Sequence, residues 1–235
     1  MGKNQLTETK RKADVDLIII VFVTLIVLGL AMALQKQFVT FVNSKSINIL
    51  LRTVVSALIQ FGIAGLGITI VSIFRKESFL SYGLKRKGAL LSIILCVLCF
   101  IPNIVFGLVS GQITSYLPFQ QVWFTKEVLS SDFPVNIIGM TLITVAWGFF
   151  EGFNYVVISD KINTRYPSKN RWVNWGAISS AILCILIHGA VGVTMESIIE
   201  MFTIIIIIYG MLMVKEFTSN AWGCVFIFVF LWNAF

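Results

Sequence analysis

Blocks of apolar residues about as long as a membrane is thick recur along the whole chain. A helix needs about 20 residues to cross the ~30 Å hydrocarbon core, and the blocks lack the alternating pattern of a membrane β-barrel strand. Of the 235 residues, 57% are hydrophobic and 12% charged, with a mean hydropathy of +0.91, unlike the composition of a soluble domain. The sequence therefore predicts an all-α, polytopic integral membrane protein that lies in the lipid bilayer.

About seven transmembrane helices account for these blocks, and they are expected to form a helical bundle with an intramembrane site. We divide the chain into a cytoplasmic basic tail, 1–16, N-terminal helices with a polar outer loop, 17–134, and C-terminal core helices, 135–235. The outer loop, 110–134, is expected to lie in the membrane interface as a lid or an anchor. The predicted spans are 17–34, 47–74, 88–109, 135–158, 174–195, 197–213 and 218–235.

The positive charges are distributed unevenly between the two sides of these spans. Fourteen of the 18 Lys and Arg residues lie in the N-terminal tail and in the second, fourth and sixth connections, whereas three lie on the opposite side. The positive-inside rule then predicts a multi-pass cell-membrane protein with its N-terminus in the cytoplasm and its C-terminus outside. Because topology explains the net charge of +7, the sequence indicates no nucleic-acid partner.

Glu151 lies inside the fourth predicted span, and His188, the only histidine of the chain, lies inside the fifth. An Asp, Lys or Arg at the centre of a membrane helix costs roughly 2.5–3.5 kcal/mol, so such a residue commonly has a partner and a function. Asn154 and Tyr155 follow Glu151 at helical spacing and share its helix face. Small residues leave space beside that face at Gly148 and Gly152.

Glu151 and His188 are equally distant from the turn-like stretch at 166–171. At ~1.5 Å per residue, both side chains lie roughly 20–22 Å from the tip of this helical hairpin, so we expect them to meet across a helix interface. The fourth helix must then continue beyond its apolar part. Its charged residues there must border water or a cavity: Asp160, Lys161 and Arg165.

Asn233 in the last span is expected at a similar depth, ~24 Å beyond the preceding turn. Glu200 mirrors it on the helix before that turn. We expect Glu200 at the outer interface, where it pairs with Arg52 or reaches water.

A Glu–His pair in a membrane can be a structural contact between helices, although polar interhelical contacts average only about 0.6 kcal/mol. Its functional roles include a proton relay, a metal site, or a general base with an assisting imidazole. One histidine and one carboxylate fall short of the three protein ligands typical of catalytic zinc. We therefore expect neither a metal nor a cofactor.

The order of these residues resembles the CPBP family of intramembrane glutamic proteases, which includes type II CAAX prenyl endopeptidases and bacteriocin-processing enzymes. The motifs of that family are E-E-x-x-x-R in one span, F-x-x-x-H in the next and H-x-x-x-N or H-x-x-x-D in the last. They align here, over roughly 135–235, with Glu151-Gly152-Phe153-Asn154-Tyr155-Val156, Cys184-x-x-x-His188 and Val229-x-x-x-Asn233.

This resemblance implies an intramembrane endopeptidase that acts on a peptide or protein substrate. By position, Glu151 and His188 activate the attacking water and Asn233 helps to bind the oxyanion.

The chain departs from the family pattern at three positions, Gly152, Val156 and Val229. Asn154 and Tyr155 are then the candidates for supporting polar groups. Two alternatives stay open. One is a catalytically inactive relative that acts as an immunity or peptide-binding membrane protein, and the other is a small transporter with a Glu/His proton relay.

Overall fold

The computed structural model of the chain describes residues 3–189 and 192–235, and all regular secondary structure in these ranges is helical. The elements are α1 (Lys3–Ala33), α2 (Gln35–Asn43), α3 (Ile49–Ala64), α4 (Leu66–Arg75), the 3-10 helix η1 (Phe79–Tyr82), α5 (Ala89–Val109), α6 (Thr125–Leu129), α7 (Val135–Ile143), the π-helix η2 (Thr144–Phe150), α8 (Glu151–Arg165), α9 (Trp175–Ile187), α10 (Met195–Thr218) and α11 (Trp222–Phe230).

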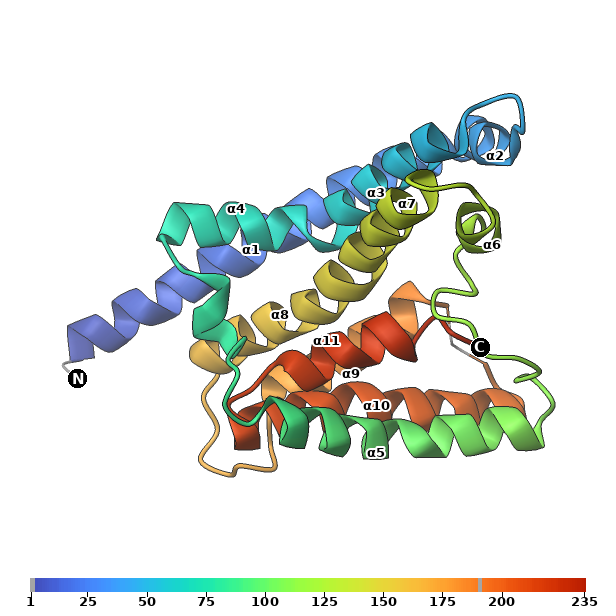
Figure 1. Cartoon of the computed structure of the whole chain (residues 1–235). Helices are drawn as coiled ribbons and strands as arrows, with labels where there is room; N and C mark the ends of the chain where they lie inside the picture. Colours follow the sequence, from blue (N-terminus) through green and yellow to red (C-terminus); the bar gives the residue numbers. More distant parts are fainter. Residues whose placement is uncertain (1–2, 190–191) are drawn as a thin grey trace.

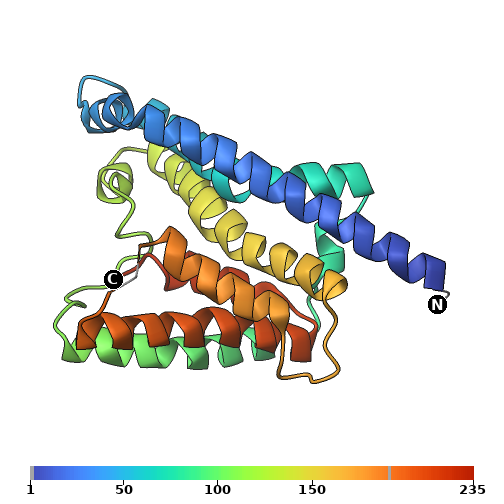
Figure 2. The same ribbon diagram turned by 180° about the vertical axis from the view of Figure 1, so that it is seen from behind.

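The helices α7, η2 and α8 follow one another without interruption and run through the middle of the bundle (Figure 1). On one side this central rod packs against α1 and α3, and on the other against α9 and α11. The helices α5 and α10 lie side by side and cover α9 and α11 from outside, as the view from behind also shows (Figure 2). The junction of η2 and α8 is therefore enclosed by helices from both halves of the chain.

In the described part of the chain, four helices are long and apolar enough to cross a membrane: Leu6–Ala33, Ala89–Val109, Val135–Arg165 and Met195–Thr218. The pair α3 and α4 provides a fifth candidate, bent by 57° at its break. These apolar helices agree with the prediction of an all-α membrane protein, but they make four or five candidate spans rather than seven.

The two other predicted spans, 174–195 and 218–235, correspond to the shorter helices α9 and α11, of 13 and 9 residues. Helix α9 ends at Ile187 and α11 ends at Phe230. The residues that follow them, His188 and Leu231, are no longer helical. At the other end of the chain, the predicted N-terminal tail is itself helical from Lys3 onward and continues into the first apolar span.

A buried ionic cluster, formed by Asp16, Arg75, Lys161 and Glu77, ties α1 to α8 and to the end of α4. Asp16 is 1% exposed and pairs with Arg75 at 2.7 Å and with Lys161 at 2.9 Å, while Lys161 also pairs with Glu77 at 2.8 Å. Two further pairs connect α8 to α1 and α10: Arg165 with Asp14, and Asp160 with Lys215. A cavity of about 550 Å³ opens beside the cluster, lined in part by Lys161 and Glu77. The fourth predicted helix thus continues through its charged residues, all of which are paired; Asp160 and Lys161 border this cavity, as expected, and the side chain of Arg165 is partly exposed.

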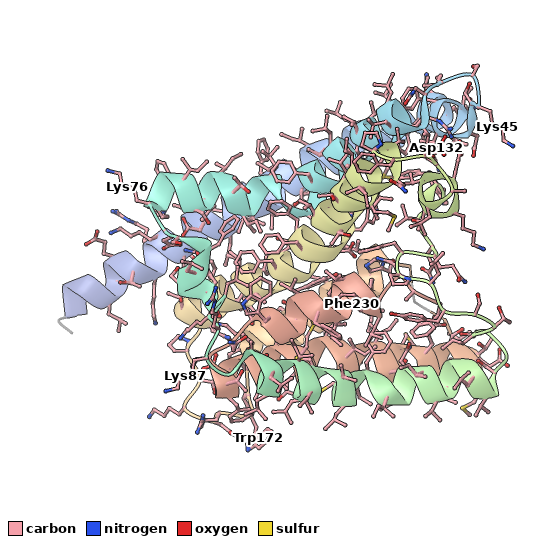
Figure 3. The ribbon with its side chains drawn as sticks, viewed as in Figure 1. Lys45, Lys76, Lys87, Asp132, Trp172 and Phe230 are labelled. Carbon is pink, nitrogen blue, oxygen red and sulfur yellow. The ribbon has the colours of Figure 1, made fainter. Side chains whose placement is uncertain are left out.

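The opposite end of the bundle is held by Arg52 of α3. Its guanidinium group pairs with Glu127 of α6 and donates a hydrogen bond to the carbonyl oxygen of Val42 at 2.9 Å. The expected pairing of Arg52 with Glu200 is therefore wrong, because the outer loop folds back and brings its own carboxylate to Arg52. Figure 3 shows Lys45 at this end, and Lys76 at the end where α1 begins.

Candidate functional site

Glu151 and His188 meet in the structure, as their equal distance from the connecting turn predicts. The Nε2 atom of His188 lies 3.6 Å from Oε1 of Glu151, and the two side chains are 37% and 11% exposed, respectively. This separation is longer than a good hydrogen bond. Catalytic contacts are often long in unliganded enzymes and shorten when the substrate binds, so this separation is compatible with a catalytic pair.

Glu151 is the first residue of α8 and directly follows the seven-residue π-helix η2. Segments of π-helix are rare and often occur at functional sites. From α3, the side-chain amide of Gln60 donates a hydrogen bond to Oε2 of Glu151 at 3.0 Å. One carboxylate oxygen is thus held by Gln60, while the other faces His188.

His188 follows the last residue of α9, and its backbone N–H donates to the carbonyl oxygen of Cys184 at 3.1 Å. The next residue, Gly189, has φ +64°, a left-handed conformation that glycine adopts without steric cost and that turns the chain away from the helix. The ring of Trp232 packs edge-on against the imidazole, with centroids 5.5 Å apart. Three small residues on one face of α9 are buried: Ala177, Ala181 and Cys184.

Asn233 lies three residues beyond the end of α11, and its carbonyl oxygen accepts a hydrogen bond from the N–H of Gln121 in the outer loop at 3.1 Å. Its side-chain Nδ2 is buried without a hydrogen-bond partner in the described part of the chain. A buried amide N–H without a partner is costly. Asn233 also lines a cavity that His188 lines.

The two predicted supporting residues lie on the same helix as Glu151 but are not joined to it. Tyr155 is buried and stacks on Phe228 of α11, with centroids 5.4 Å apart. The Oδ1 atom of Asn154 is buried without a hydrogen-bond partner in residues 3–189 and 192–235. No described hydrogen bond links either side chain to Glu151, so the amide that holds the carboxylate is Gln60 instead.

Direct helix packing occupies the positions at which the chain departs from the CPBP pattern. A Cβ atom at Gly152 would lie 3.0 Å from the backbone oxygen of Cys224, and one at Gly148 would lie 2.6 Å from a methyl group of Val229. Val156 is completely buried. The close approach of α8 to α11 thus takes the space that a second glutamate and a histidine would need.

Replacing Gly152 by Ala is expected to destabilise the protein, because the added methyl group meets the backbone of α11 at Cys224 and the buried side chain of Phe228. Overpacking of this kind typically costs about 1–3 kcal/mol. Thermal unfolding in detergent measures the effect. Gly29→Ala is the matched control, since nothing lies within 4 Å of a Cβ atom at that position of α1. Equal stability of the two variants would contradict the packing explanation.

Two cavities flank the site, and Gln121 and Asn233 line both. The first, which we call the polar cavity, has a volume of about 430 Å³ and contains His188 and Glu200 among its lining residues. The second, the aromatic cavity, has a volume of about 330 Å³ and includes Gln60. Four large aromatic side chains line the aromatic cavity: Phe38, Trp123, Phe124 and Trp147.

The outer loop forms the wall between these cavities. The backbone N–H of Leu117 donates a hydrogen bond to the carbonyl oxygen of Ala234 at 2.9 Å. The side-chain amide of Gln121 donates one to the backbone oxygen of Phe235 at 2.9 Å. Two aromatic residues of the loop itself, Phe119 and Phe124, are buried. The loop is therefore docked on the end of the chain that carries Asn233.

Gln60 and the π-helix are the parts of the site that sequence reasoning missed. A signal for Gln60 did exist, because it is the only side-chain amide within the predicted span 47–74 apart from Asn48 at its start.

No group of three or more potential metal ligands occurs in the described residues. No family model matches the chain, and comparisons with curated proteins and with solved structures also find no match.

Proposed function

We propose that the chain is an intramembrane endopeptidase, with Glu151 as the general base, His188 as the assisting acid and base, and Asn233 as an oxyanion donor. The observation that supports this proposal best is the 3.6 Å approach of Glu151 to His188 beside a polar cavity. The hydrogen bond from Gln60 adds to it, because a base that is held by a third group keeps its orientation toward the reacting water.

In the proposed reaction, Glu151 takes a proton from a water molecule whose oxygen attacks the peptide carbonyl carbon. The carbonyl oxygen becomes an oxyanion, which accepts a hydrogen bond from the unpaired amide of Asn233. The proton then passes to the leaving nitrogen, with His188 assisting the transfer, and the carbon–nitrogen bond breaks. The products are a peptide with a new carboxyl terminus and a peptide with a new amino terminus.

We further propose that all seven predicted segments cross or enter the cell membrane, with the N-terminus in the cytoplasm. In this arrangement α9 and α11 are short membrane segments that need not reach both surfaces, because they pack against the longer helices α5, α8 and α10. The distribution of cations supports this orientation: Lys76 and Lys87 lie toward the end where α1 begins, and Lys45 lies at the other (Figure 3).

A catalytically inactive, peptide-binding protein is the second candidate function. The packing at Gly152 and Val229 favours it, because these positions hold helix contacts where the family pattern has polar groups that would tune the base. This candidate requires that a Glu151→Gln variant retain the full biological activity of the chain.

The two candidates differ in whether new peptide termini form. Membranes from cells that express the wild type or the Glu151→Gln variant are incubated in ¹⁸O-labelled water, and peptide termini are then identified by mass spectrometry. An endopeptidase yields new carboxyl termini carrying one ¹⁸O atom with the wild type only. Identical sets of termini from both proteins would exclude the endopeptidase and favour the peptide-binding protein.

A further inference from the structure

Glu200 gives the polar cavity a negative charge that the described lining residues do not compensate. Its side chain is the only acidic one among these lining residues, none of which is Lys or Arg. The other polar side chains are neutral amides and an imidazole: Asn103, Gln112, Gln121, Asn233 and His188.

The carboxylate of Glu200 has no hydrogen-bond or ion-pair partner in the described part of the chain, although its backbone is firmly held. Thr203 donates its hydroxyl group to the carbonyl oxygen of Glu200 at 2.7 Å and accepts a hydrogen bond from Asn103 of α5 at 2.9 Å. Arg52, the cation that the sequence suggests for Glu200, is bound to Glu127 instead. The backbone of Glu200 is thus held in place, while its carboxylate lines the cavity without a described partner and is free to bind a ligand.

We propose that the polar cavity binds a cationic nitrogen of the substrate peptide, and that Glu200 is the carboxylate that selects it. An unpaired charge at the rim of a low-dielectric site binds an opposite charge strongly, because water screens the pair poorly. The aromatic cavity on the other side of the site accepts apolar groups. The substrate is then a peptide with a basic group on one side of the bond to be cleaved and apolar residues on the other.

This inference rests on the proposed function for its substrate, but direct binding tests it without cleavage. The probe is a short, fluorescein-labelled apolar peptide with a single lysine, titrated against detergent-solubilised full-length protein that carries Glu151→Gln. A second peptide has glutamine in place of the lysine. Each peptide is prepared with a free and with an acetylated amino terminus, which separates a basic side chain from a terminal amine as the bound cation.

We expect Glu200→Gln to weaken binding of the cationic peptide by about ten- to a hundredfold, the range for losing a charged hydrogen bond. Binding of the neutral, acetylated peptide should not change. Glu200→Lys should reverse the preference, so that a peptide with glutamate in place of lysine binds best. Glu196→Gln is the matched control, because this carboxylate lies on the first turn of the same helix, is exposed and does not line the cavity.

The results distinguish this inference from the proposed function. Binding that depends on Glu200 and on the cationic group, without any cleavage by the wild type, would support the inference and refute the endopeptidase. Cleavage that requires Glu151 but is indifferent to both Glu200 and the cationic group would overturn the inference alone. Equal binding of all the peptides, or binding of none, would also overturn it.

Discussion

Replacing Glu151 by Gln is expected to eliminate peptide cleavage while leaving the fold intact. The substitution keeps the size of the side chain and the contact with Gln60, but it removes the group that accepts the proton of the attacking water. A general base typically contributes 10²–10⁴-fold to the rate, so kcat should fall by about that factor with little change in KM. The His188→Ala variant should also have a lower kcat than the wild type. Kinetics on a peptide found in the ¹⁸O experiment measure both effects.

A carboxylate outside the site provides the control for this loss of activity. Glu216 lies near the end of α10 and is exposed, so Glu216→Gln should leave kcat unchanged. Thermal unfolding of each variant shows whether the protein has kept its fold. Wild-type cleavage by a folded Glu151→Gln variant would refute the assignment of Glu151 as the base.

Replacing Asp16 by Ala is expected to give the largest loss of stability. This carboxylate is 1% exposed and pairs with both Arg75 and Lys161, so its removal leaves two cations without their shared partner. Removing one member of a buried ion pair typically costs about 3–5 kcal/mol. The free energy of unfolding in mixed detergent micelles, or the Tm at fixed detergent concentration, measures the loss.

The pair of Glu8 with Lys12 on the same helix is the matched control, because both side chains are more than half exposed. Solvent-exposed pairs of this kind contribute little, so Glu8→Ala should leave the Tm unchanged. Equal losses in the Asp16→Ala and Glu8→Ala variants would show that the buried ionic cluster does not hold α1 against α8.

The same cluster should weaken in acid because of Glu77. Burial raises the pKa of this carboxyl group, but hydrogen bonds from Lys161 and Tyr82 outweigh that effect and hold the pKa below its ordinary value. A carboxyl group whose pKa is lower in the folded state stabilises the protein above its unfolded pKa, and this contribution disappears as the pH falls through the folded pKa. The stabilisation by Glu77 is therefore present at neutral pH and is lost in acid.

The contact between Glu151 and His188 could be predicted from the sequence because only one turn separates their helices. Counting residues from that turn gives the depth of each side chain, and helical periodicity gives the face. The continuation of α8 to Arg165 followed from the same counting. These predictions depend on local geometry along a single helical hairpin.

The partners that come from distant segments could not be predicted in this way. Gln60 reaches Glu151 from α3, and Glu127 reaches Arg52 from the outer loop, so each contact depends on how separate helices pack. No sequence spacing specifies that packing. Hydropathy also does not show where a helix ends within an apolar block, and the described residues therefore contain four or five long apolar helices where seven spans were predicted.

Glu151 lies within a continuous helical rod, whereas His188 and Asn233 each follow the last residues of a helix. A change in a few backbone dihedral angles can therefore move either partner toward the carboxylate while every helix stays in place. Loop motions of this kind occur in nanoseconds to microseconds, faster than the collective movement of helices. A rearrangement of the site can thus be a local event that leaves the helices unchanged.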